Sequence, residues 1–77
     1  MDVFAKVKEF IMMQLPVTAE RVVPEAKLIE DLGADSANLM MLIMDVEQEF
    51  GIMVEDDALS TLVTVGDVVK YLEAHTK

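Results

Sequence analysis

Hydrophobic residues recur three or four positions apart in three stretches of this 77-residue chain, which is the spacing of amphipathic helices. The first stretch covers residues 3–15, with Asp2 placed to cap the helix and Pro16 to end it. The second covers residues 36–50 and is followed by Gly51, a residue favoured directly after a helix. The apolar positions are Val3, Phe4, Val7, Phe10, Ile11 and Leu15 in the first helix, and Leu39, Leu42, Ile43, Val46 and Phe50 in the second.

The rest of the chain predicts a last helix and two connections. Thr64 and Asp67 form a pair like a capping box, and hydrophobic residues follow them at helical spacing. Residues 16–34 show no sustained period, so we expect a long, semi-ordered loop, a feature that is often functional in a small domain. A short helical turn is predicted near residues 56–60. The apolar positions of the last helix are Val65, Val68, Val69 and Leu72, and the expected anchors of the loop are Val22, Leu28 and Leu32.

These elements predict an all-α fold: a small four-helix bundle of three main helices and one short helix, with a long loop between the first two. The length suits a single domain over residues 1–77. With no Cys, the fold must rest on its core, and 53% of the residues are hydrophobic. Only 5% are aromatic, so the core is aliphatic, with seven Met residues in the chain to fill irregular space.

The predicted helix over residues 36–50 is unusual because the side opposite its core face is also apolar. At 100° per residue that side holds Ala37, Met41, Met44 and Gln48, with Met40 on its flank, while Asp45, Glu47 and Glu49 lie to the sides. An exposed apolar stripe bordered by acids is typical of a docking surface. The alternative is that the loop or the short helix covers part of the stripe. We favour docking, since the helix already has a complete core face.

The charge of the chain is strongly negative and unevenly placed. The formal net charge is −9, and residues 28–69 contain ten Asp and Glu but no Lys or Arg. Such a field repels nucleic acid and anionic membranes and attracts basic protein surfaces, and it keeps a small protein monomeric. No apolar run is long enough to span a membrane, which favours a cytoplasmic location. Loose carboxylate clusters could hold a divalent ion weakly, but a solvated acidic face is the better interpretation, and no metal is expected.

Ser36 stands at the start of the second helix, directly after Asp35, and allows three interpretations. Catalysis is poorly supported: there is no G-x-S-x-G motif, and the only histidine, His75, lies near the end of the chain, so we expect no enzyme. Helix capping is well supported, because Asp and Ser are both preferred N-cap residues. A phosphate linked to Ser36 would also be stable there, because free N–H groups and the helix dipole favour an anion. Gly33 and Ala34 leave room for another protein to approach.

Three segments carry a resemblance to a known family. "LIEDLGADS", over residues 28–36, precedes an apolar helix that ends in "EQEFGI", and "TVGDVVKYL" lies near the end of the chain. Together with the length, the acidity and the helical pattern, they resemble the acyl carrier protein family over essentially the whole chain. The resemblance implies that Ser36 carries covalent 4′-phosphopantetheine from coenzyme A, next to Asp35 and Gly33, and holds acyl groups as thioesters. The cargo would retract between the helices.

The resemblance also implies partners: a phosphopantetheinyl transferase and acyl-processing enzymes of fatty acid or related acyl and polyketide biosynthesis. The surface they would read consists of Ala37, Met40, Met41, Met44, Asp45, Glu47 and Gln48, beside Asp35. The chain departs from the family's usual pattern at Ala37, Met41, Gln48 and Glu55, where Leu, Glu, an acid and Pro are common. These departures favour a specialised carrier. The rival hypothesis from another class is a helical interaction module without an arm, which binds a partner protein through its Met-rich face.

Overall fold

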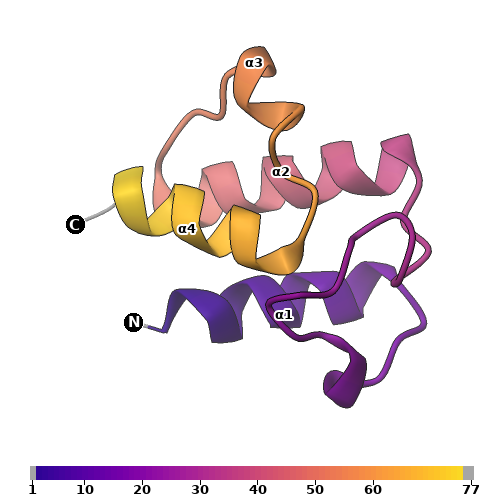
Figure 1. Ribbon diagram of the computed structural model, residues 1–77. Coiled ribbons are helices and arrows are strands. Elements are labelled where there is room, and N and C mark those ends of the chain that lie inside the picture. Colours follow the sequence, from indigo (N-terminus) through magenta and orange to yellow (C-terminus); the bar gives the residue numbers. More distant parts are fainter. Residues whose placement is uncertain (1, 76–77) are drawn as a thin grey trace.

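A computed structural model describes residues 2–75, and three long helices form most of that part of the chain (Figure 1). They are α1 (Val3–Gln14), α2 (Ser36–Phe50) and α4 (Val65–His75), and they are accompanied by the short helix α3 (Asp56–Leu59) and the 3₁₀ turn η1 (Ala19–Arg21). Within the described residues there is no strand, and an isolated bridge pairs Lys27 with Thr64. The predicted all-α fold, with three main helices and one short one, is confirmed.

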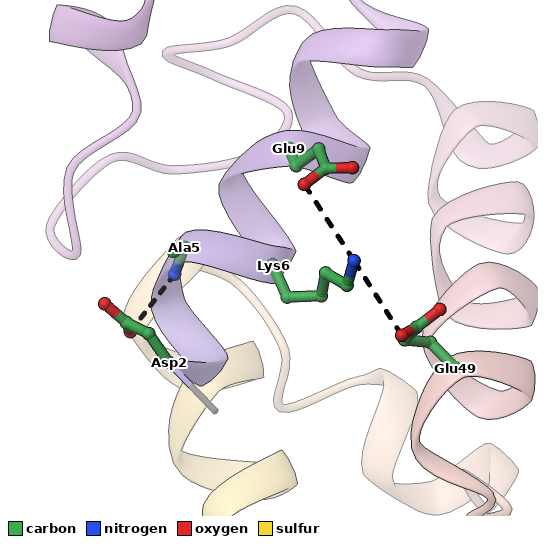
Figure 2. A network of polar contacts seen from close by, with 5 residues as sticks. All are labelled: Asp2, Ala5, Lys6, Glu9 and Glu49. Atoms are coloured by element: carbon green, nitrogen blue, oxygen red, sulfur yellow. Dashed lines mark hydrogen bonds and ion pairs between the residues drawn. The ribbon is translucent and has the colours of Figure 1, made fainter.

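The ends of the helices follow the predicted signals. The Asp2 carboxylate accepts a hydrogen bond from the backbone N–H of Ala5 at 3.2 Å and caps α1 (Figure 2). Gly51 ends α2 in the left-handed conformation, with φ of 66°. The first helix ends at Gln14, one residue earlier than predicted, and Leu15 is extended, with φ of −120° and ψ of 144°. The ring of Pro16 disfavours helical geometry in the residue before it, which explains the earlier end.

The core lies where α1 packs against α2 and α4, and α3 lies on the side of the molecule away from α1 (Figure 1). Its members are aliphatic, as predicted, and the described part of the chain buries no polar or charged residue among them. Burial of such side chains is the main favourable term in the stability of a small domain. The core residues are Val7, Ile11, Leu15, Val22, Ala26, Leu28, Leu32, Ala34, Leu42, Ile43, Val46, Val54, Leu62, Val65, Val68 and Leu72.

The long loop before α2 is tied to the start of α4. Its three predicted anchors, Val22, Leu28 and Leu32, are all buried. Its backbone also bonds to the segment that leads into α4. The three bonds run from Leu28 N to Val63 O at 2.9 Å, from Val65 N to Ala26 O at 3.0 Å, and from Gly66 N to Pro24 O at 2.8 Å. These bonds and the three buried anchors join the loop to the bundle, where the sequence alone predicted only a semi-ordered segment.

The start of α4 is held by the predicted pair of Thr64 and Asp67. The Thr64 hydroxyl accepts a hydrogen bond from Asp67 N at 3.1 Å, and the Asp67 carboxylate accepts one from Thr64 N at 3.0 Å. A further bond reaches Asp67 from Val63 N at 3.1 Å. The Thr64 backbone bond, with help from Val63, the Thr64 hydroxyl and the charge of Lys70, lowers the pKa of Asp67 against the opposing effect of desolvation.

A small polar network joins α1 to α2 (Figure 2). The ammonium of Lys6 lies 3.9 Å from Glu9 on its own helix and 3.8 Å from Glu49 on α2. All three side chains are partly exposed to solvent, so the pairs contribute roughly 0–1 kcal/mol each. None of the helices in residues 2–75 combines the length and the apolar run needed to cross a bilayer.

Candidate functional site

A hydrogen-bonded turn over residues 27–34 precedes Asp35 and Ser36. The Asp31 carboxylate accepts from Lys27 N at 2.8 Å, and Ala34 N donates to Leu28 O at 2.9 Å. Gly33 lies between these bonds with φ of 78°, a left-handed conformation in which a Cβ is strained. The "LGADS" segment therefore has a definite shape, and the role that the structure shows for Gly33 is to close this turn.

Asp35 caps α2, as the sequence predicted. Its carboxylate accepts a hydrogen bond from Asn38 N at 2.8 Å, and the Asn38 side-chain oxygen accepts one from Asp35 N at 3.2 Å. This is a complete capping box, in which Asn38 plays the part usually given to Glu or Gln. Sequence reasoning missed Asn38, although its position three residues after the cap was a usable signal. Because Asp35 and Asn38 form the cap, the hydroxyl of Ser36 is not required to cap α2.

Ser36 is the first residue of α2 and is exposed. At this end of a helix the first backbone N–H groups lack intrahelical partners, and the dipole is positive. The first turn itself carries no acidic residue, and the neighbouring acid, the N-cap Asp35, directs a carboxylate oxygen to the N–H of Asn38. The position thus combines an accessible hydroxyl with an environment that stabilises a phosphate on it.

An apolar cavity of about 180 Å³ opens beside Ser36. Besides Ser36, every side chain that lines it is hydrophobic: Leu28, Leu39, Met40, Ile43, Leu59 and Leu62. A second cavity, of about 320 Å³, shares four of these residues and extends toward Lys27 and Val63. An apolar cavity of about 150 Å³ in another protein is large enough to bind benzene. The space next to Ser36 therefore fits a small aliphatic group.

The outer face of α2 is exposed. We use this name for Ala37, Met40, Met41, Met44 and Gln48, all of which the structure leaves open to solvent. The exposed fractions are 51% for Met40, 56% for Met41 and 53% for Met44. The alternative, that the loop or α3 covers part of the stripe, finds support only at Met40, which shares a cavity with Leu28 of the loop and Leu59 of α3. Met40 belongs both to the outer face and to the wall of the cavity beside Ser36.

The acidic residues of α2 are engaged with their neighbours in the fold. Asp45 is half-buried and accepts a hydrogen bond from the Gln14 side chain on α1 at 3.2 Å. Glu47 is half-buried and accepts from Val54 N at 2.8 Å, beyond the end of the helix. Glu49 faces Lys6, as described above. Asp45 and Glu47 thus flank the outer face, and the surface between them is uncharged.

His75 and the acidic clusters are the other candidates in the sequence for a catalytic or a metal site. His75 stacks on Tyr71, with ring centroids 4.1 Å apart, and its Nδ1 lies 2.8 Å from the Tyr71 carbonyl oxygen at the end of α4. Among the described residues, no group of three or more His, Asp or Glu side chains is placed to hold a metal ion. The side chain of Asp56, a member of one acidic cluster in the sequence, lies outside what the structure describes.

Comparisons with known proteins agree with this geometry. A family model described as "Phosphopantetheine attachment site" matches residues 5–72. An acyl carrier protein of Thermotoga maritima is 51% identical over 72 residues, which are 94% of this chain and 89% of that protein. One of Nitratidesulfovibrio vulgaris is 50% identical over 72 residues, with 94% and 95% covered. A solved structure of an acyl carrier protein from Enterococcus faecalis superposes with a TM-score of 0.84 at 30% identity and covers 96% of this chain and 94% of its own.

A helical bundle with an accessible serine at a helix start, matched by this family model, defines a phosphopantetheine-binding carrier domain. The chain belongs to the acyl carrier protein family, whose members carry acyl intermediates on a covalently attached 4′-phosphopantetheine arm. The family and the cofactor that the resemblance implied are confirmed.

Proposed function

We propose that Ser36 is the residue that bears the arm and that the chain works as one carrier domain over residues 1–77. The observation that carries this proposal is the exposed hydroxyl at the first position of α2, next to an apolar cavity. When bound, 4′-phosphopantetheine supplies a terminal thiol that holds an acyl group as a thioester. The chain has no Cys, so its own residues offer no competing thiol.

The neighbours of Ser36 position it. Asp35 keeps α2 capped by accepting from Asn38 N, and the earlier N–H groups of the first turn, which have no carbonyl partner within the helix, would favour the phosphate on Ser36. Gly33 maintains the turn that places Asp35 and Ser36 at the surface. On this proposal Asp35 and Gly33 act by holding the backbone at the attachment site.

The cavity beside Ser36 would receive the cargo. Its aliphatic lining favours a hydrocarbon chain, because each methylene transferred from water to an apolar site gains about 0.8 kcal/mol. Leu39 of α2 and Leu59 of α3 both line this space, and both are only half-buried. Burial of the chain there would shield it from water between encounters with enzymes.

The outer face of α2 would be the surface that partner enzymes bind. Those partners are a phosphopantetheinyl transferase and acyl-processing enzymes of fatty acid or related acyl and polyketide biosynthesis. An uncharged, Met-rich strip between Asp45 and Glu47 fits an apolar partner surface edged with basic residues. The net charge of −9 disfavours nucleic acid and anionic membranes, and we propose a monomeric, cytoplasmic carrier without catalysis of its own.

The departures from the usual family pattern fall largely on this face. Ala37, Met41 and Gln48 are all exposed on α2. Glu55, the fourth departure, precedes α3 and makes no side-chain cap hydrogen bond there. We therefore propose a specialised carrier whose partners recognise an apolar α2. If the elongation enzymes of fatty acid synthesis process its acyl form as well as that of a typical carrier, this part of the proposal is wrong.

Intact-mass measurement tests the attachment residue. After incubation with coenzyme A and a broad-specificity phosphopantetheinyl transferase, the chain should gain the mass of one arm. Ser36→Ala should gain nothing, while Ser60→Ala, which removes the other serine of the chain, should load normally. Loading of Ser36→Ala would place the arm elsewhere. No loading of the unaltered chain would favour the rival, a helical interaction module without an arm.

A second experiment tests the docking surface. Met41→Ala and Met44→Ala should each raise the KM of the transferase for the carrier, because each reduces the apolar area on the outer face. The matched control is Met13→Ala, which removes an exposed thioether from α1. Circular dichroism should show the same helical signal in all variants. Unchanged kinetics in both α2 variants would mean that the outer face is not the binding surface.

A further inference from the structure

Methionine is concentrated on the outer face of α2, outside the buried core. Three of the seven Met residues, Met40, Met41 and Met44, lie there, and each is about half exposed. None belongs to the buried core. Since the chain has no Cys, thioethers are the only sulfur groups that its own residues offer to an oxidant.

An enzyme that acts on the Ser36 hydroxyl while it binds along the outer face of α2 would contact these thioethers. At about 1.5 Å of rise per residue, Met40, Met41 and Met44 lie roughly 6, 7.5 and 12 Å along the helix axis from Ser36. Met40 shares the wall of the cavity with Ser36 itself. The α2 carboxylates Asp45 and Glu47 are already bonded within the fold. Between these two carboxylates, contact with a transferase would rest on the apolar area that the three Met side chains supply.

We infer that Met40, Met41 and Met44 form a reversible oxidation site, at which conversion to the sulfoxide by a peroxide blocks docking of the enzyme that loads Ser36. The inference rests on the proposed function of Ser36. In the reaction the thioether sulfur attacks one peroxide oxygen, the O–O bond breaks and an S–O bond forms. With hydrogen peroxide the second oxygen leaves as water, and the sulfur loses the two electrons that the peroxide gains. Methionine sulfoxide reductases reverse the change with electrons from a thiol.

The sulfoxide opposes docking for a simple physical reason. Its oxygen is a strong hydrogen-bond acceptor, and burying it against an apolar partner surface leaves it without the water that it bonded before. The same change at Met40 places a polar oxygen in the wall of the hydrophobic cavity. The change leaves the formal charge and the core residues untouched, so the fold persists while recognition is lost.

The test uses the full-length chain before the arm is attached. It is treated with hydrogen peroxide and desalted, sulfoxides are located by peptide mass spectrometry, and loading from coenzyme A is followed by intact mass. We expect the KM of the transferase for the oxidised carrier to rise about tenfold, equivalent to ~1.4 kcal/mol. Treatment with methionine sulfoxide reductase and a thiol reductant should restore it. An unchanged KM with sulfoxide present on α2, or the absence of sulfoxide from α2, would overturn the inference.

Two variants separate this effect from oxidation elsewhere. M40L/M41L/M44L keeps the apolar area without a thioether, so peroxide should leave its KM unchanged. M13L/M53L removes two thioethers that are more exposed, at 73% and 80%, so its sensitivity should match that of the unaltered chain. Inhibition of the triple variant by peroxide would contradict the inference. Failure of the untreated chain to load would refute the proposed function itself, and this inference with it.

Discussion

Asp35 and Asn38 cap α2 reciprocally, each accepting a hydrogen bond from the backbone N–H of the other, at 2.8 and 3.2 Å. Ser36 lies between them in sequence and takes no part in this exchange. Adjacent residues thus have separate tasks: Asp35 stabilises the helix, and Ser36 offers its hydroxyl to chemistry. A modification on Ser36 can be added without removing a cap.

This separation predicts opposite results for two neighbouring alanine substitutions. Asp35→Ala should lower the free energy of unfolding by about 1 kcal/mol, because it removes the acceptor for Asn38 N. Ser36→Ala should leave that free energy nearly unchanged but abolish loading with the arm. Urea denaturation followed by circular dichroism measures the first effect, and intact mass measures the second. Equal losses of stability in both variants would show that Ser36 shares the cap.

The cavity beside Ser36 predicts a difference in stability between loaded forms. A carrier that bears a short aliphatic acyl group should unfold at a higher temperature than the form with a free thiol, with a gain of about 2–3 kcal/mol if three or four methylenes are buried. Leu59→Phe, which fills the space from α3, should remove most of this difference. Met12→Phe, at an exposed position on α1, serves as the control. The same acyl-dependent gain in Leu59→Phe would place the cargo outside the cavity.

The close approach of Gly66 to Pro24 predicts that Gly66→Ala lowers the stability of the fold. Alanine is intrinsically better than glycine within a helix by about 1 kcal/mol. A Cβ at residue 66, however, would lie 2.9 Å from the carbonyl oxygen of Pro24, which also accepts the Gly66 N–H bond at 2.8 Å. Because backbone has to move, we expect Gly66→Ala to lose about 1–3 kcal/mol of stability. Chemical denaturation would detect it, and a stabilised variant would show that the loop is not firmly held against α4.

The lowered pKa of Asp67 predicts a dependence of stability on pH. Its ionised form is favoured in the folded chain by the bonds from Thr64 and Val63, so its contribution is complete above the ordinary Asp pKa of about 3.9. The contribution declines as the pH falls through that value toward the lower folded pKa. Asp67→Asn should therefore be less stable than the unaltered chain at neutral pH, with a gap that narrows in acid. Asp57→Asn, which removes one carboxylate at an exposed position, is the matched control for the loss of a charge.

Much of the fold could be predicted from local signals. The bounds of α2, from residue 36 to residue 50, follow from Asp35 before it and Gly51 after it. The Thr64–Asp67 capping pair could also be predicted from a local signal, because the two residues lie within one helical turn of each other. The first helix was predicted one residue too long because the effect of Pro16 on Leu15 was not taken into account.

The features that sequence reasoning missed depend on residues far apart in the chain. The close contact of Pro24 with Gly66 and the burial of Val54 and Leu62 have no local periodicity. The cavity is lined by three separate stretches of the chain, at Leu28, over residues 36–43 and over residues 59–62, so its volume could not be read from any one of them. Retraction of cargo between the helices was expected only through the family resemblance, and the structure supplies the space.

The uncharged outer face of α2 has a kinetic consequence. The net charge of −9 acts over about 8–10 Å at ordinary ionic strength, whereas the thioethers act only in contact. Added salt should therefore slow the rate at which a basic partner meets this carrier but leave the lifetime of the complex nearly the same. Loss of Met41 or Met44 should shorten that lifetime and spare the encounter rate. The carrier would thus attract partners by its overall charge and retain them by its thioethers.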